Sequence, residues 1–300
     1  MKSIKIYTLA ILVTVFFVSS ALFAKEKKQS FSGKDHVRIK LVLSDCEISG
    51  SADDKVYVTV NYTYDDQDYE ISFKEKSHRL VLSEDYLDDD PDGDAKWTIK
   101  VPKGTEIDFE SATGDVRIDN LDEVTIEASS GTGCLHVENT NGELELNSGT
   151  GDVILVDCEG EFDLNSGTGD VSIEKVEGIF DLNSGTGDVL AEKITIVEEA
   201  ELNSGTGEVE VISPMGEDFE LSINSGTDDA ILDMSGVPIK GYFEFTVHSR
   251  RGRIVCPVKF DKVEEYEEND SDYTKKSFTK GKDTPKYFIS SGTGKAKLVK

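Results

Sequence analysis

Six acidic residues recur at one position of a repeated motif, and they are the clearest candidates for chemistry in this 300-residue sequence. Each stands two residues after a threonine that is usually flanked by glycines. They are Asp115, Asp152, Asp170, Asp188, Glu208 and Asp229. If the copies stack as β-strands about 4.8 Å apart, like charges form a row that either faces water or binds cations between its members. Calcium suits oxygen-rich turns of this kind, so this acidic row is the candidate metal site, with a solvated acidic face as the alternative.

The four cysteines are the second candidate for chemistry. They are Cys46, Cys134, Cys158 and Cys256. An even number of cysteines in an exported chain invites a disulfide framework. The sequence repeat described below instead places Cys46 and Cys256 on inward-facing strand positions of coils that lie several coils apart. It places Cys134 and Cys158 near opposite turns of their coils. We therefore expect unpaired thiols, because a disulfide requires Cα atoms within about 7 Å.

Residues for catalysis are hard to find in this sequence. The four histidines are scattered, and the Gly-Thr-Gly turns lack the lysine that follows in phosphate-binding loops. Carboxylate pairs such as those of β-helix glycosidases could arise anywhere in so acidic a chain, so a carbohydrate-active enzyme is the least favoured alternative. We assign no catalytic residue and no cofactor other than the calcium considered above.

A repeat determines where these residues lie. The motif Asn-Ser-Gly-Thr-Gly-Asp-Val occurs intact at 147–153, 165–171 and 183–189, and its variants extend from 110 to 296. The anchoring threonines, mostly 18–21 residues apart, are Thr113, Thr132, Thr150, Thr168, Thr186, Thr206, Thr227 and Thr293. Apolar residues stand six and four positions before each anchor and three and five after it, and each pair has the two-residue period of a half-buried strand.

The repeat predicts an all-β protein, a β-solenoid of about nine or more coils with two short strands in each coil. One coil cannot bury its apolar side chains alone, and stacking buries them in a continuous core. A degenerate copy at 248–254 fits the same four rows with Arg251 as its anchor. The apolar columns should place Phe162 next to Phe180, and Leu164 next to Leu182.

The turn residues have structural explanations. We expect the glycines beside each threonine to supply positive φ for a tight reversal. The stacked asparagines should form a hydrogen-bonded amide ladder. They are Asn147, Asn165, Asn183, Asn203 and Asn224.

Five segments are predicted. Residues 1–24 resemble a signal peptide, with a lysine-containing start, an apolar run and small residues before cleavage after Ala21 or Ala24; an uncleaved membrane anchor is the alternative. Residues 25–105 form an irregular N-terminal β cap that leads into the solenoid, which occupies 106–258. A charged inserted loop at 259–285 precedes a terminal coil at 286–300.

Charge limits the partners. The chain has 60 acidic and 32 basic residues, for a net charge of −28, and residues 111–235 hold 30 acidic residues against three basic ones. Such a surface repels phosphate, which argues against nucleic acid and anionic membranes. Disorder is the other usual meaning of this charge, but the regularly spaced apolar residues argue against it.

The chain resembles the bacterial DUF4097 family, called "putative adhesins" and related to the GIN-type head domains of autotransporter adhesins. The resemblance rests on Trp97-Thr-Ile-Lys-Val-Pro102 and on the Ser-Gly-Thr-Gly-Asp-Val copies, and it covers about residues 35–300. It implies an exported β-solenoid with no established activity and no catalytic residues.

These observations predict a non-enzymatic scaffold, exported to the periplasm, the cell surface or the medium, that binds an envelope protein or a glycan. A calcium-binding structural repeat module is the first alternative. End-to-end self-association is another, if the final coil exposes an unpaired strand. We expect no insertion of the mature chain into the membrane.

Overall fold

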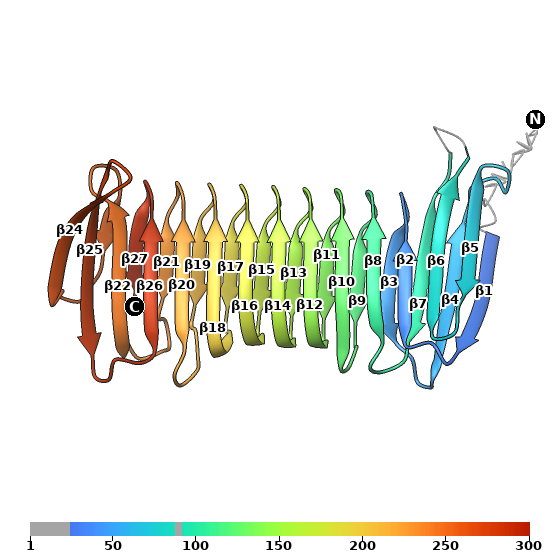
Figure 1. The fold of residues 1–300 in the computed structure, drawn as a ribbon, viewed down its shortest axis with the longest axis horizontal. Helices are drawn as coiled ribbons and strands as arrows, with labels where there is room; N and C mark the ends of the chain where they lie inside the picture. The colour runs from blue at the N-terminus through green and yellow to red at the C-terminus, as the bar shows by residue number, and fades with distance from the viewer. Residues whose placement is uncertain (1–24, 88–91) are drawn as a thin grey trace, which may run out of the picture.

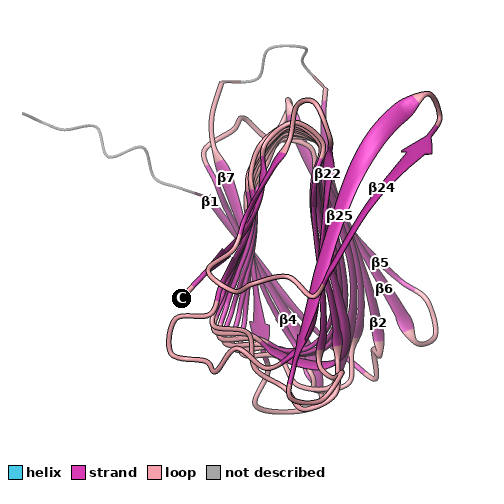
Figure 2. Ribbon diagram, turned by 90° about the vertical axis from the view of Figure 1, so that its left-hand side faces the viewer, coloured by secondary structure: helices cyan, strands magenta, loops and turns pink. Residues whose placement is uncertain are grey.

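The computed structural model describes residues 25–87 and 92–300, so the expected signal peptide lies outside the described residues. All regular structure in these residues is β-strand, arranged in two long sheets that face each other across a narrow core (Figures 1 and 2). Within the same residues no helix has the length and apolar character needed to cross a membrane. The predicted all-β solenoid is confirmed.

Both sheets run the length of the molecule (Figure 1). Sheet A contains, in spatial order, β1 (Lys25–Ser32), β4 (Lys55–Tyr62), β7 (Ala95–Val101), β3 (Asp45–Gly50), β9 (Val116–Asp119), β11 (Leu135–Glu138), β13 (Val153–Val156), β15 (Val171–Glu174), β17 (Val189–Glu192), β19 (Val209–Ile212), β21 (Ala230–Asp233), β27 (Lys295–Val299) and β23 (Arg253–Val255). Sheet B contains β24 (Lys262–Glu268), β25 (Ser271–Lys280), β22 (Gly241–His248), β26 (Lys286–Ser291), β20 (Glu220–Ser225), β18 (Thr195–Ser204), β16 (Glu177–Ser184), β14 (Glu159–Ser166), β12 (Asn141–Ser148), β10 (Val124–Ser130), β8 (Glu106–Ser111), β2 (His36–Lys40), β6 (Arg79–Tyr86) and β5 (Tyr69–Glu75).

The apolar columns are in the predicted register. Phe162 pairs with Phe180 and Leu164 with Leu182 across β14 and β16. The two phenylalanine rings stack with centroids 5.7 Å apart and planes 12° apart. All four side chains are buried, and the residues between them on each strand point outward. Because the strands of the regular coils alternate in this way, one coil's four apolar side chains meet those of the next coil in a continuous core.

The glycines of the tight turn have a different cause from the one expected. Gly167 and Gly169 do not have positive φ. A Cβ on Gly169 would lie 2.4 Å from the carbonyl oxygen of Gly151 in the preceding coil. Close stacking of turn on turn therefore requires glycine here. Positive φ occurs instead at Gly160 and Gly178, which lie near the start of β14 and β16, just after the looser turn.

The N-terminal segment joins the solenoid as a coil of its own. Val37 and Ile39 pair with Ile107 and Phe109, the apolar residues six and four positions before the Thr113 anchor. The coil of β6 and β7 stacks on the far side of β2 and β3, so the first coil in the chain is the second in space. Antiparallel β4 and β1 extend sheet A and antiparallel β5 extends sheet B, and these strands cap the end.

The C-terminal end departs from the prediction in three ways. The final coil of β26 and β27 lies between the coil of β20 and β21 and the coil of β22 and β23, so it is not terminal in space. Its strands are paired on both sides, and the condition set for end-to-end self-association by this coil is not met. Residues 259–285 contain the antiparallel hairpin of β24 and β25 and are not simply a loop.

The third departure concerns the degenerate copy at 248–254, whose predicted strand register in sheet B is wrong. Phe243 pairs with Tyr287 and Phe245 with Ile289, two residues away from the register expected with Arg251 as anchor. Ile254 pairs with Ala296 as expected in sheet A. The turn from β22 to β23 is therefore two residues longer than a regular turn, and the motif letters did not reveal this.

Candidate functional site

The acidic row lies along one edge of the solenoid, in the tight turns between the sheets. Asp152 Oδ1 accepts the backbone N–H of Asp170 at 2.9 Å, and Asp170 Oδ1 accepts that of Asp188 at 2.8 Å. The same contact joins Asp188 to Glu208 at 2.7 Å and Asp115 to Cys134 at 2.8 Å. One oxygen of each of these aspartates therefore satisfies a turn amide of the next coil.

This arrangement gives the row a structural task. Within residues 25–87 and 92–300 no three carboxylates of the row bring ligand oxygens within 4.8 Å of one another. Burial raises the pKa of Glu208, and the neighbouring charges of Glu210 and Asp229 add to this effect. For Asp229 burial opposes the change, but hydrogen bonds and charge from Lys295 lower its pKa. Calcium binding at the row stays a prediction.

Two further rows complete the turns. Ser166, which is buried, accepts the N–H of Gly169 at 2.8 Å and donates its hydroxyl to the carbonyl of Gly151 at 2.9 Å. The asparagine ladder is confirmed, since Asn165 donates to Asn147 Oδ1 at 3.1 Å. The remaining links run from Asn183 to Asn165, from Asn203 to Asn183 and from Asn224 to Asn203.

A groove of about 740 Å³ lies on the outer face of sheet B. Its floor is the backbone of the inward-facing column, and its walls are two columns of outward side chains. We call it the acidic groove. Its carboxylate residues are Glu127, Glu143, Glu145, Glu161, Asp163, Asp181, Glu199, Glu201 and Glu220.

The strand register aligns the groove's charges. Glu145, Asp163, Asp181 and Glu201 pair directly across β12, β14, β16 and β18. Desolvation raises the pKa of Asp181, and the charges of Asp163 and Glu201 raise it further, against a hydrogen bond from Asn183. Among the described residues no ion pair reaches these four carboxylates, so the groove keeps its negative charge.

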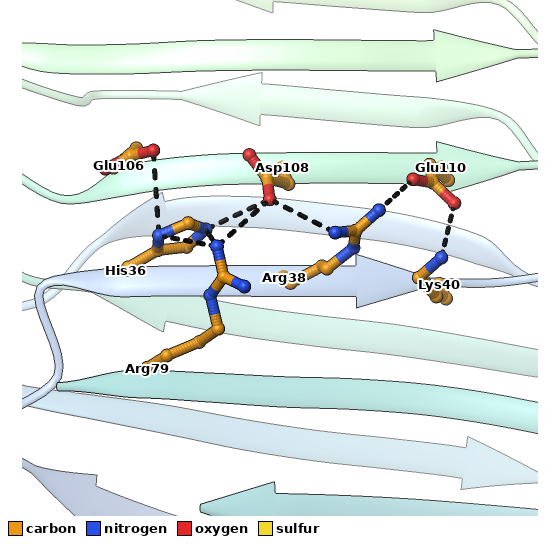
Figure 3. A network of polar contacts seen from close by, with 7 residues as sticks. All are labelled: His36, Arg38, Lys40, Arg79, Glu106, Asp108 and Glu110. Carbon is orange, nitrogen blue, oxygen red and sulfur yellow. Dashed lines mark hydrogen bonds and ion pairs between the residues drawn. The ribbon is translucent and has the colours of Figure 1, made fainter. Parts of the chain in front are cut away.

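At the N-terminal end of the acidic columns, basic side chains of β2 and β6 pair with the acidic residues of β8 (Figure 3). His36 Nε2 lies 3.0 Å from Asp108 Oδ2, and its Nδ1 lies 3.6 Å from Glu106 Oε1. Two residues further along β8, Glu110 pairs with Arg38 at 2.5 Å and with Lys40 at 2.8 Å. Lys40 and Arg38 together lower the pKa of Glu110. The charges of β8 are thus neutralised by β2.

His36, Glu106 and Asp108 are also the one group in the described part of the chain whose ligand atoms lie close enough to hold a metal ion. A guanidinium nitrogen of Arg79 lies 3.1 Å from His36 Nε2 and 4.0 Å from Asp108 Oδ2. A second guanidinium, that of Arg38, lies 3.9 Å from the same oxygen. Two fixed positive charges at these atoms oppose a cation, and the cluster is an ion-pair network.

At the C-terminal end of the acidic columns, lysines of β26 and β27 pair with one acidic residue of β20 and one just before β21. Lys286 pairs with Glu220 at 2.5 Å, and Lys295 Nζ pairs with Asp229 Oδ2 at 2.8 Å. Between these two borders no ion pair among the described residues reaches Glu145, Asp163, Asp181 or Glu201, which face outward along the groove. The positions of both borders follow from the order in which the coils stack.

The cysteines take no part in the groove. All four are free thiols in the structure. Cys46 and Cys158 are buried, and burial raises the pKa of both thiols. Cys134 and Cys256 are partly exposed in different coils.

The family described as Toastrack DUF4097 matches residues 33–235, more than half of the chain. The chain belongs to the DUF4097 family. The match covers the coil of β2 and β3, the N-terminal cap beyond β1 and the regular coils through β21. No curated protein matches the sequence.

Several solved structures are similar to this DUF4097 chain. A "putative adhesin" from Parabacteroides distasonis is 14% identical with a TM-score of 0.38, covering 92% of this chain and 97% of that one. A "putative lipid binding protein" from the same species is 15% identical, with a TM-score of 0.34 and the same coverage. A "putative cell adhesion protein" from Clostridium sporogenes is 13% identical with a TM-score of 0.25, covering 92% and 98%. At these scores the likenesses carry no functional argument.

Sequence reasoning missed the acidic groove as a site. It identified the outward positions as acidic, but it chose the turn row as the candidate. The signal was available in the alternation itself, because Glu145, Asp163 and Asp181 occupy one outward position of successive copies. The sequence did not reveal the recess between the two columns, because residues of six different strands of sheet B line it.

Proposed function

We propose that this DUF4097 protein is a non-enzymatic interaction protein of the cell envelope that binds a cationic polypeptide segment in its acidic groove. The observation that supports this most directly is the aligned column of Glu145, Asp163, Asp181 and Glu201, which no basic side chain among the described residues neutralises. Such a charged wall attracts and orients a basic partner. Phosphate polymers and anionic lipids would be repelled.

The binding test uses a lysine-rich peptide as the probe. The purified protein should bind oligolysine more weakly as salt rises, because exposed charges are screened. The triple variant Glu145→Gln, Asp163→Asn, Asp181→Asn should weaken binding about tenfold. A matched control, Glu70→Gln, Glu217→Gln, Glu267→Gln, removes three exposed carboxylates that lie outside the groove and, within the described part of the chain, have no ion pair. Equal weakening in both variants would show that net charge alone attracts the peptide, and it would reject the groove.

Export is the second part of the proposal, and it rests on the pattern of residues 1–24. Cleavage after Ala24 would leave β1 complete, because this strand begins at Lys25. N-terminal sequencing of the protein from an envelope fraction should start at Lys25 or, for cleavage after Ala21, at Leu22. An intact Met1 in that fraction would favour the uncleaved anchor.

Calcium binding at the acidic row is the second candidate function. It is supported by Asp152, Asp170 and Asp188, whose Oδ1 atoms accept turn amides while no basic side chain in the described part pairs with these residues. Calcium should then raise the melting temperature, and Asp170→Asn should reduce the rise. An unchanged melting temperature across a calcium titration would reject this function.

A further inference from the structure

One column of the acidic groove contains a break in its polar pattern. This column is formed by the residue that directly precedes the buried column on each strand. Its polar members are Thr125, Glu143, Glu161, Glu199 and Glu220. The remaining member is Ile179 on β16, a partly exposed residue that pairs directly with Glu161. Outward strand positions are normally polar, and a break in that pattern is where a role beyond folding is expected.

A β-bulge lies beside Ile179. The pairing of β16 with β18 shifts register after Gly178 and resumes at Phe180. Between these two residues, Ile179 faces three residues of β18, 197–199, instead of one. Bulges redirect side chains and are over-represented next to functional sites. The bulge therefore alters the groove wall at the same place where the polar pattern breaks.

The bulge brings a second apolar side chain to this place. Val197 follows buried Ile196, which pairs with Gly178, so Val197 lies beside Ile179 on the outer face of sheet B. Its side chain is 53% exposed. We call Ile179 and Val197 the apolar pair.

Acidic residues surround the apolar pair. Glu161 is next to Ile179 in the column, and Asp181 lies two residues further along β16 on the same face. Glu199 follows in the bulge and is exposed. Because β14 and β18 line the groove on either side of β16, the apolar pair lies inside the groove and not at one end. A central apolar contact within a charged rim is the usual arrangement of a protein recognition surface.

The surroundings of the apolar pair limit what can cover it. About half of Val197 stays in contact with water, so packing of the pair within the chain leaves apolar surface that a ligand can still bury. A second copy of the groove would bring like charges together, and an anionic lipid headgroup would be repelled by the same carboxylates. The occupant must therefore offer positive charge and an apolar side chain together.

We infer that the cationic segment bound in the acidic groove carries a large aliphatic residue between its basic residues, and that this side chain packs on Ile179 and Val197. The inference rests on the proposed function and specifies the sequence pattern of its partner. Exposed ion pairs contribute little individually, whereas covering an aliphatic side chain contributes more. The apolar pair thus distinguishes one basic segment from another, a choice that the acidic columns alone do not make.

The test compares two oligolysine peptides of equal length and charge, one with a central serine and one with a central leucine, by calorimetry at low salt. The leucine peptide should bind the wild-type protein about tenfold more tightly than the serine peptide. Ile179→Thr should abolish this preference and leave the affinity for the serine peptide unchanged, because the charge of the groove is the same. Threonine fits this column, since Thr125 occupies it on β10.

Leu190→Thr is the matched control, because Leu190 is a 37% exposed aliphatic residue on the outer face of sheet A. This variant should keep the full preference for leucine. If neither peptide binds the wild-type protein, the proposed function fails and the inference fails with it. If both bind equally well, or if Leu190→Thr loses the preference as Ile179→Thr does, the inference is overturned while the function of the groove stands. An equal loss of both peptides in Ile179→Thr would assign Ile179 to the fold and would also overturn it.

Discussion

The regular coils and the N-terminal end solve the same problem, the unpaired amides of a tight turn, in opposite ways. In the regular coils each turn uses several small contacts, such as those of Ser166 with Gly169 and of Asp152 with Asp170. At the N-terminal end one buried carboxylate, that of Glu84 on β6, serves the turn at residues 42–44. Distributed contacts tolerate the loss of one member, and a single central group does not.

Glu84 is surrounded by donors. Its Oε1 accepts the backbone N–H groups of residues 42, 43 and 44 at 2.7, 3.1 and 3.1 Å. Its Oε2 accepts the Tyr69 hydroxyl at 2.7 Å and the Trp97 indole N–H at 3.0 Å, together with the Ser44 hydroxyl. A charged acceptor with this many donors fixes three elements of the cap at once.

The largest expected effect comes from Glu84→Leu. The substitution leaves buried donors of Tyr69, Trp97 and residues 42–44 without an acceptor, so we expect a loss of about 3–5 kcal/mol in the free energy of unfolding of the cap. Trp97 is the sole tryptophan, so its fluorescence in a urea titration reports on this end. Exposed Glu70→Gln on β5 is the control. A loss below about 1 kcal/mol would contradict the central role of Glu84.

A smaller effect is expected from Ser166→Ala in a regular coil. The change removes two hydrogen bonds in one turn while the turns above and below keep theirs, so we expect a loss of about 1–3 kcal/mol. Circular dichroism should report it, and Trp97 fluorescence should change less. Ser172→Ala, an outward-facing serine on β15, should have little effect. A loss as large as that of Glu84→Leu would mean that the repeated contacts are not redundant.

The smallest effect concerns the charge that the regular coils carry. Because the folded state raises the pKa of Asp181, it holds that proton more tightly than the unfolded chain does, and stability falls as pH rises through the raised value. Asp181→Asn should therefore stabilise the protein at about pH 7 and much less at about pH 4, by under ~1 kcal/mol because the group is exposed. Urea midpoints at both pH values measure this. An equal change at both would exclude charge repulsion as the cause.

The regular coils were predictable because one rule applies to every copy. The column through Leu144, Phe162 and Phe180 could be read from spacing alone, and so could the asparagine ladder at Asn165. The N-terminal coil at Val37 and Ile39 followed the same offsets. The role of Glu84 could not be inferred, because its partners lie on a turn about 40 residues away and on two other strands.

The repeat pattern by itself determined the two-strand coil, the inward columns and the outward acidic positions, because side-chain alternation along a strand is a local property. Only the tertiary structure decided the order in which coils stack at the two ends, the two-residue shift at Phe243 and Phe245, and the outward hairpin. The physical reason is that every coil offers its neighbours the same columns and the same backbone edge. A repeating sequence therefore specifies how coils pair, while end capping and the length of the connections select which coils become neighbours.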